Sequence, residues 1–327
     1  MSRSPTPGTE ALVEGVFARE PRRIAQAISA AESGEGVPDL LRAIFPRTGR
    51  ARILGLTGPP GAGKSTLALR IAQVYRGRGR TVGIVAVDPS SPFTGGAILG
   101  DRIRMGEIYT DPGVFIRSMA TRGVMGGLAR ATSDAVDILD AAGFDVVLIE
   151  TVGVGQDEVD IVKTAETVAV VLVPGLGDDI QAIKAGILEI ADVFVVNKAD
   201  REGADRASAE LTMMLDLAPT ARDWRPPIVR TVAPRGEGVE KVVEAMESHG
   251  VSLRNSPEGR RRDSRRARSR LLALLAERFH RTVESRAPEP DGLEDAVERV
   301  RDRSEDPYSA AGRLFERLVR EPAVERA

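Results

Sequence analysis

A glycine-rich segment that ends in Lys-Ser-Thr is the part of this sequence best suited to hold phosphate. It reads Gly58-Pro59-Pro60-Gly61-Ala62-Gly63-Lys64-Ser65-Thr66, after the apolar run 53–57 and at the start of a helical pattern over 66–75. In a strand–loop–helix context, the G-x-x-x-x-G-K-[ST] spacing lets backbone N–H groups surround phosphate oxygens at a helix N-terminus. Lys64 would reach the β- and γ-phosphates, and Ser65 would bind Mg²⁺. The segment therefore predicts a nucleoside triphosphate site.

A second polar segment, Asn197-Lys198-Ala199-Asp200, follows the apolar run 193–196 and favours guanine as the base. Asp200 can accept from the imino and amino protons of guanine, which adenine cannot supply. Lys198 could lie along the base plane, and Asn197 could brace the loop. Four such residues can also form an ordinary turn, but behind a phosphate loop they indicate a base site. A third base loop is expected at Thr231-Val232-Ala233, where backbone amides could meet the guanine carbonyl oxygen.

Three carboxylates stand where a nucleotide site needs a metal. Asp88 ends the second apolar run, Asp101 lies beyond the segment 89–100, and Glu150 ends the run 146–149. Mg²⁺ takes few carboxylates and keeps several waters, so we expect these residues to serve the ion together with Ser65. Asp88 could instead cap a loop, and Asp101 could be a solvated residue at a helix start.

The segment after Glu150 is expected to sense the γ-phosphate through the backbone amide of Gly153, which makes Lys64, Glu150 and Gly153 the expected catalytic groups. Many GTPases place a water-orienting glutamine directly after this glycine, but here that residue is Val154 and the next glutamine is Gln156. We therefore expect slow intrinsic hydrolysis that a partner accelerates. No arginine finger can be assigned, although Arg102, Arg104, Arg117 and Arg122 are near in sequence.

Seven short apolar runs that alternate with helical patterns predict an α/β fold. Such alternation is typical of a mostly parallel sheet with helices on both faces, here of the P-loop NTPase kind. The runs are 53–57, 82–87, 114–118, 146–150, 168–173, 193–197 and 228–232. We expect an N-terminal helical extension over 1–50, a nucleotide-binding domain over 51–250 and a helical region over 251–327. The last region has more apolar face than a lone arm could bury, so it should pack on the main domain or on a second subunit.

Composition excludes several other classes of protein. The chain has 327 residues, a net charge of -2, no cysteine and two histidines, so disulfides and soft-metal sites are excluded. No global positive charge favours nucleic acid or a membrane surface. The stretch 260–270 holds seven arginines, but without interleaved aromatics it is typical of a solvated helix face. The N-terminus lacks the apolar segment of a signal peptide, and we expect the protein in the cytoplasm.

Together these segments resemble the bacterial MeaB/ArgK group of GTPases, the accessory proteins of methylmalonyl-CoA mutase. The matching stretches are 58–66, 87–102, 150–156, 174–184 and 197–200. The resemblance implies GTP/GDP and Mg²⁺ as ligands and a homodimer joined through the C-terminal helices. It implies binding to an adenosylcobalamin-dependent acyl-CoA mutase, GTP-gated delivery of the cofactor to that mutase, and its protection or reactivation. It also implies that Asp88, Asp101 and Glu150 serve Mg²⁺ and switching, and that 174–184 is a further switch with Asp178, Gln181 and Lys184 as candidates.

Three other classes remain as alternatives. A kinase would need a base for an acceptor hydroxyl and usually takes ATP, against which Asn197 to Asp200 argues. A nickel-type metallochaperone GTPase would need a Cys/His entry site, which this composition does not supply. A targeting GTPase of the signal-recognition type would carry an apolar or RNA-binding appendage, which the sequence does not indicate.

Overall fold

A computed structural model describes residues 7–33, 37–88, 108, 110–120, 127–151, 161–175, 187–217, 224–254, 256–286 and 291–320 of the chain. The chain divides into two compact units, Met1–Ser264 and Arg265–Ala327. Each unit is described by itself, and the long helix α12, Pro257–Ser285, contributes residues to both.

The first unit is built on a seven-stranded parallel sheet in the order β3-β2-β4-β1-β5-β6-β7. The strands are β1 (Arg52–Thr57), β2 (Val82–Asp88), β3 (Val114–Ala120), β4 (Val146–Thr151), β5 (Thr167–Leu172), β6 (Val193–Asn197) and β7 (Ile228–Thr231). Each of the seven apolar runs in the sequence forms one of these strands, so the predicted α/β fold is confirmed. Consecutive strands run in the same direction, which places all their carboxyl ends along one edge of the sheet.

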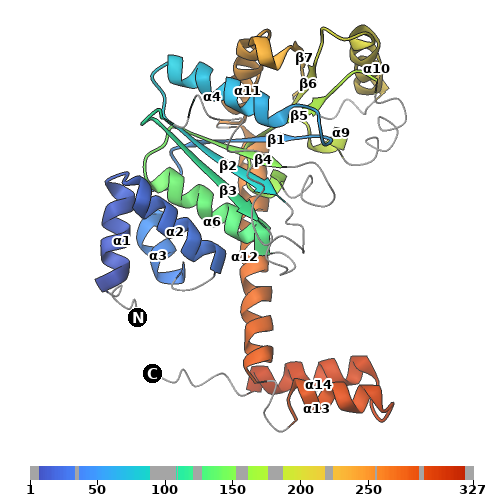
Figure 1. The fold of residues 1–327 in the computed structure, drawn as a ribbon. Coiled ribbons are helices and arrows are strands. Elements are labelled where there is room, and N and C mark those ends of the chain that lie inside the picture. The colour runs from blue at the N-terminus through green and yellow to red at the C-terminus, as the bar shows by residue number, and fades with distance from the viewer. Residues whose placement is uncertain are drawn as a thin grey trace. The chain divides into compact units, whose positions relative to one another are not determined.

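Helices cover both faces of this sheet (Figure 1). The longer ones are α1 (Pro7–Phe17), α2 (Pro21–Ser33), α3 (Val37–Ile44), α4 (Lys64–Gly77), α6 (Gly127–Ala141), α10 (Ala204–Leu217) and α11 (Val239–Leu253). Short helices are η1 (Phe45–Arg47), η2 (Ile161–Lys163), α9 (Ile187–Ile190) and η3 (Ala233–Arg235). Because strand side chains alternate between faces, the core divides into two clusters. One packs strand residues against α2, α3, α6 and α10, and the other packs the alternate residues against α4 and α11.

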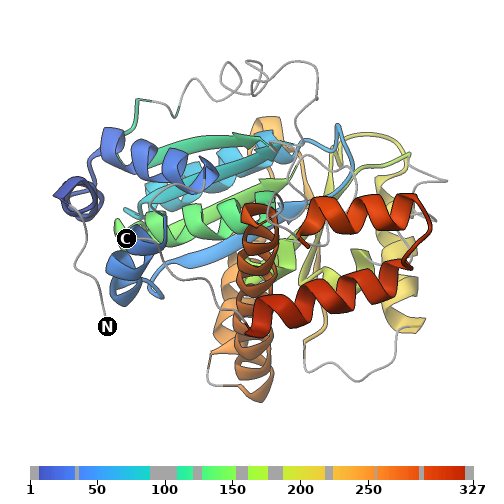
Figure 2. The same ribbon diagram turned by 90° about the horizontal axis from the view of Figure 1, so that it is seen from below.

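The N-terminal helices belong to the first of these faces. Their apolar residues are buried, among them Ile24, Ile28, Leu40 and Ile44, and α2 packs along α6, as Figure 2 shows from below. Arg117 on the edge strand β3 donates to Glu32 on α2 over 2.6 Å. This ion pair fixes α2 against the sheet edge, where an unpaired strand would otherwise be exposed.

A buried polar cluster lies at the amino-terminal ends of β5 and β6, opposite the edge that carries the nucleotide motifs. Asp192 is 3% exposed, and its carboxylate accepts from the backbone N–H of Val168 over 3.0 Å and from Arg262 on α12 over 2.9 Å. His249, which is fully buried, lies 3.3 Å from the same carboxylate. The Trp224 ring contacts His249 in a tilted arrangement, with 5.0 Å between ring centroids, and Trp224 donates its indole N–H to the backbone oxygen of Asp192 over 2.8 Å. The cluster anchors the first turns of α12 to the sheet.

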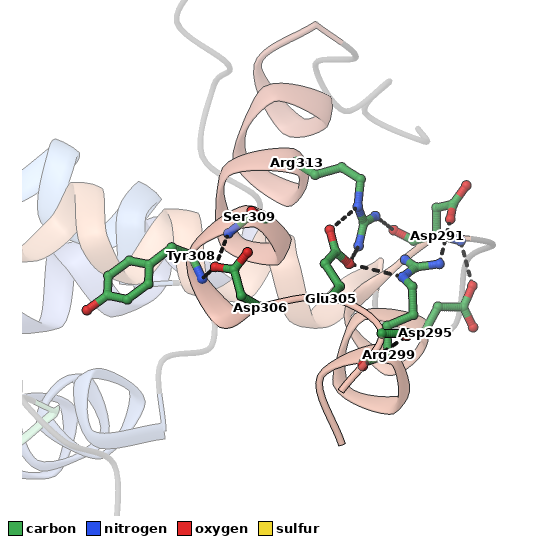
Figure 3. Close-up of polar contacts among 9 residues, drawn as sticks. Asp291, Asp295, Arg299, Glu305, Asp306, Tyr308, Ser309 and Arg313 are labelled. Carbon is green, nitrogen blue, oxygen red and sulfur yellow. Dashed lines mark hydrogen bonds and ion pairs between the residues drawn. The ribbon is translucent and has the colours of Figure 1, made fainter. Parts of the chain in front are cut away.

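The second unit consists of the rest of α12 with α13 (Leu293–Arg301) and α14 (Pro307–Arg320). Asp306 caps the start of α14, because its carboxylate accepts from the backbone N–H groups of Tyr308 and Ser309. Glu305 accepts from Arg299 over 3.1 Å and from Arg313 over 2.9 Å, which joins α13 to α14 (Figure 3). The hydrogen bond from Arg313 is the main cause that lowers the pKa of the Glu305 carboxyl; burial opposes it, and Arg299 adds to the lowering.

An apolar stripe of α12 is exposed among the described residues. Leu271, Leu272, Leu274 and Leu275 are all more than 40% exposed, while Phe279 contacts Phe315 of α14 at 5.7 Å between ring centroids. None of the helices in the described ranges has the length and apolar character needed to cross a membrane.

The buried His249 predicts a specific loss of stability in acid. Burial is the main cause that lowers its pKa below 6.5, Arg262 adds to the effect, and Asp192 opposes it. The unfolded chain therefore binds more protons than the folded chain below pH 6.5, and the free energy of unfolding falls as the pH falls. We expect His249→Gln to remove part of this fall, by up to about 1.4 kcal/mol per pH unit.

The measurement is urea unfolding of wild type and variant between pH 5 and 7.5. His280→Gln is the matched control, because His280 is exposed and pairs with Glu284 within α12. If His249→Gln and wild type lose stability with the same slope, the buried histidine does not carry the effect.

Candidate functional site

The nucleotide motifs meet because the four strands that carry them end along the same edge of the sheet. The phosphate loop follows β1, Glu150 lies near the end of its neighbour β4, Asn197 ends β6, and Thr231 ends β7. Strand β1 is central. The chain passes from β1 to β2 on one side of it and later from β4 to β5 on its other side, which makes the carboxyl ends of β1 and β4 the switch point of the sheet. Ligands of open α/β sheets bind at such a point.

The phosphate loop has a backbone conformation that only glycine can adopt at two of its positions. Gly58 has φ +137°, and a Cβ there would lie 2.1 Å from the backbone oxygen of Val171. Gly63 has φ +87°, and a Cβ there would lie 2.5 Å from the amide nitrogen of Asn197. Glycine is required at both positions because L side chains rarely adopt such φ values. Helix α4 then begins at Lys64, so its first N–H groups face the loop.

Lys64 lies inside the loop that precedes it. Its ammonium donates to the backbone oxygens of Gly58 over 2.7 Å and Pro59 over 2.9 Å, and the residue is 5% exposed. A buried ammonium needs such partners. Held there, it places a positive charge at the centre of the loop, where phosphate oxygens of a bound nucleotide would take up the same donors.

Ser65 and Glu150 come together across the β1–β4 boundary. The Ser65 hydroxyl donates to Glu150 Oε1 over 2.5 Å, and Glu150 is 5% exposed. Behind them, Thr151 on β4 donates to Thr57 on β1 over 3.0 Å in a buried bond. A hydroxyl and a carboxylate side by side are oxygen ligands of the kind that Mg²⁺ prefers. The pair therefore fits a magnesium ion held directly by Ser65 and, through water, by Glu150.

The other predicted metal and switch residues cannot be placed at the same detail. Asp88 ends β2 on the strand that pairs with β4, where Val87 is opposite Thr151, but its side chain lies outside the described residues. Asp101, Gly153, Asp178, Gln181 and Lys184 also lie outside them. Within the described residues there is no group of three or more His, Asp or Glu side chains that could hold a metal.

Asn197 connects the phosphate loop to the base loops. Its amide donates to the backbone oxygen of Ala62 over 2.8 Å. Its amide oxygen accepts from the hydroxyl of Thr231 over 3.0 Å and from the backbone N–H of Ala233 over 3.1 Å. The side chain is buried and satisfied on both sides, so it fixes the distance between the segment that would hold phosphates and the loop that would meet the base. These hydrogen bonds are the contacts that the predicted bracing role of Asn197 requires.

Lys198 and Asp200 follow on the same turn. Lys198 has φ +56° and donates to the backbone oxygen of Gly61 over 2.8 Å, so its aliphatic stem lies beside the phosphate loop. Asp200 is exposed and accepts from Arg235 of η3 over 3.2 Å. The backbone N–H of Ala199 donates to Thr231 over 3.0 Å, which ties this turn to the third loop. The structure thus brings Asn197–Asp200 together with Thr231, Val232 and Ala233.

Two arginines at the base loops were not predicted from the sequence. Arg70 on α4 donates to the backbone oxygens of Ala233 over 3.2 Å and Pro234 over 2.6 Å, and Arg235 contacts Asp200. Arg70 is one helical turn after Thr66, on the helix that begins in the phosphate loop. This position is the only feature of the sequence that places Arg70 near the site, and it does not show which groups the side chain contacts. Arg117, one of the near arginines, is paired with Glu32 and so serves the sheet edge.

Comparisons with known proteins agree with this geometry. The family model described as methylmalonyl-CoA mutase-associated GTPase MeaB matches residues 24–287. A Pyrococcus horikoshii protein named as a GTPase is 50% identical over 314 residues, or 94% of this chain and 98% of the relative. The GTPase ArgK of Escherichia coli is 36% identical over 235 residues, or 71% and 68% of the two chains. A solved LAO/AO transport system kinase shares the fold, with a TM-score of 0.69, 23% identity and coverage of 97% and 100%.

The Ser65–Glu150 pair predicts how the site responds to Mg²⁺. Glu150→Gln keeps the shape but removes the charge that would hold the waters of the ion. We expect the affinity for Mg²⁺ in the GTP complex to fall by about 10-fold to 100-fold, the usual loss for an outer-shell partner of a metal. The affinity for GDP in EDTA should stay within about twofold of wild type, since the phosphate loop is intact.

Fluorescent-nucleotide titrations over a range of Mg²⁺ concentrations measure both quantities. Glu210→Gln is the control, because Glu210 is an acid on α10 that pairs with Arg206 away from the site. An unchanged Mg²⁺ dependence in Glu150→Gln would place the ion elsewhere.

Proposed function

This chain belongs to the MeaB family of methylmalonyl-CoA mutase-associated GTPases, and from that membership we propose that it gates the loading of adenosylcobalamin into a B12-dependent acyl-CoA mutase. It hydrolyses GTP to GDP and phosphate, as its relatives named as GTPases do. The proposal adds that it protects or reactivates the mutase, that Mg²⁺ accompanies the nucleotide, and that hydrolysis is slow until the mutase is bound.

One observation carries the nucleotide part of the proposal: the Asn197 side chain joins Ala62 of the phosphate loop to Ala233 of the base loop. A guanine nucleotide spans the distance between those loops, with its phosphates over Gly58 to Thr66 and its base against Asp200. Val232 and its neighbours would present backbone amides to the base. Asp200 would accept from the two guanine donors, and a site that pairs a substrate N–H discriminates strongly against an analogue that lacks it.

The residues of the phosphate loop would carry the chemistry of hydrolysis. The first N–H groups of α4 and the loop amides would bind the phosphates, and Lys64 would stabilise the charge that develops on the transferred group. Ser65 and Glu150, with Asp88 and Asp101, would hold Mg²⁺, which supplies further charge stabilisation. The Gly153 amide would contact the γ-phosphate. The sequence offers no glutamine directly after it, which supports slow turnover by the chain alone.

The partner part of the proposal is supported by the family description and by the surface of the second unit. The exposed leucines of α12 form an apolar stripe. Such a stripe is unusual on a helix that faces only water, which supports a homodimer formed through residues 251–327. The segment with Asp178, Gln181 and Lys184 is proposed to report the nucleotide state to the mutase. The proposed compartment is the cytoplasm, where GTP is available.

The test uses the mutase of the same organism, purified without its cofactor. We expect gel filtration to show a complex whose amount differs between GDP and a nonhydrolysable GTP analogue. In that complex the rate of GTP hydrolysis should rise by about tenfold or more, and the transfer of adenosylcobalamin should depend on which nucleotide is bound.

Lys64→Ala is the matched control, since it removes the phosphate contact while leaving the α12 surface unchanged. It should abolish the difference between the two nucleotides. No complex under any nucleotide condition, or hydrolysis equally fast with and without the mutase, would refute the partnership.

A further inference from the structure

The guanidinium of Arg235 lies between two carboxylates at the base loops. It is 3.2 Å from Asp200 Oδ2 and 3.5 Å from Glu237 Oε1. Asp200 is the residue expected to read guanine, while Glu237 stands on the same loop as Arg235. The contact to Asp200 therefore joins the turn after β6 to the loop after β7 through side chains, in addition to the backbone bond from Ala199 to Thr231.

The loop that carries Arg235 is held on both sides. Val232 and Glu237 form an antiparallel bridge, with the N–H of Val232 donating to Glu237 over 3.1 Å. Gly238, with φ +76°, closes the loop where a Cβ would lie 2.0 Å from the backbone oxygen of Arg230. Arg70 binds the carbonyl oxygens at 233 and 234 from the other side. Arg235 thus projects from a backbone held on both sides, which fixes the point from which its side chain reaches Asp200.

We propose that Arg235 is a positioning residue for base recognition, which holds the Asp200 carboxylate in the orientation that accepts both guanine donors. A carboxylate oxygen can accept more than one hydrogen bond, so Arg235 and a guanine donor can share Oδ2. Glu237 orients the guanidinium of Arg235, and this guanidinium orients the carboxylate of Asp200. This inference rests on the proposed base site, and it adds the residue that makes that site selective.

The size of the expected effect follows from exposure. The side chains of Arg235 and Asp200 are 60% and 39% exposed, and ion pairs of this kind add little to stability. Their influence is on the orientation of one carboxylate. We therefore expect Arg235→Ala to leave the melting temperature near that of wild type and to lower the affinity for GDP by about threefold to tenfold.

The discriminating measurement compares GDP with inosine diphosphate, which lacks the 2-amino group and offers Asp200 a single donor. Arg235→Ala should lower the affinity for GDP by about threefold to tenfold and the affinity for inosine diphosphate by less than about twofold. A single hydrogen bond tolerates a rotated carboxylate better than a pair of hydrogen bonds does. The preference for GDP over inosine diphosphate then narrows. An equal loss for both nucleotides would mean that Arg235 only stabilises its loop, and no loss for either would also overturn the proposal.

The same substitution in the Asp200→Asn background separates this inference from the base site itself. If Asp200 reads the base, Asp200→Asn alone exchanges the preference for GDP for a preference for xanthosine diphosphate. Adding Arg235→Ala should then change the affinity for xanthosine diphosphate by less than about twofold. If Asp200→Asn does not exchange the preference, the proposed base site is wrong. If it does and Arg235→Ala costs the same in both backgrounds, only the role of Arg235 is wrong.

Arg230→Ala is the matched control. Arg230 is an exposed arginine of strand β7 whose side chain pairs with Asp205 of α10 over 2.5 Å, so it makes the same kind of contact without touching Asp200. It should leave the affinities for GDP and inosine diphosphate unchanged.

Discussion

The nucleotide site depends on one buried amide. The Asn197 side chain satisfies the carbonyl oxygen of Ala62 and the N–H of Ala233 at once, and both hydrogen bonds are buried. An unsatisfied buried polar group costs about 1–3 kcal/mol, so the three loops keep one relative arrangement. Gly63 allows this close approach, since any Cβ there would collide with the same amide. The geometry of phosphate and base recognition is therefore set by the fold before any ligand binds.

The parallel sheet provides the setting for that contact. Strands β1, β4, β6 and β7 deliver their motifs to one edge, while the opposite edge holds the cluster of Asp192, His249 and Arg262 that fixes the start of α12. The nucleotide motifs and the cluster that holds α12 thus lie at opposite ends of the strands. The two core clusters pack the two faces of the sheet against helices between these edges.

Much of this could be predicted from the sequence, because it follows from local rules. Apolar runs bounded by glycine and polar residues predicted all seven strands, and a Gly-rich loop before Lys64 predicted the start of α4. Long-range contacts between individual side chains could not be predicted, because no spacing encodes them. The reach of Arg70 to Ala233, the pairing of Arg235 with Asp200 and the burial of His249 beside Asp192 each join segments more than 30 residues apart. The role of each site residue, by contrast, stays a prediction until ligands are measured.

The most direct test of the account is calorimetry of GDP and of inorganic pyrophosphate with wild type and Asn197→Ala, at a temperature where both are folded. If Asn197 couples the two halves of the site, wild type binds GDP far more tightly than pyrophosphate. The substitution should then weaken GDP by about 100-fold, from the loss of roughly 3 kcal/mol of preorganised contacts, and weaken pyrophosphate much less. GDP binding that is equally tight in the variant would contradict the account.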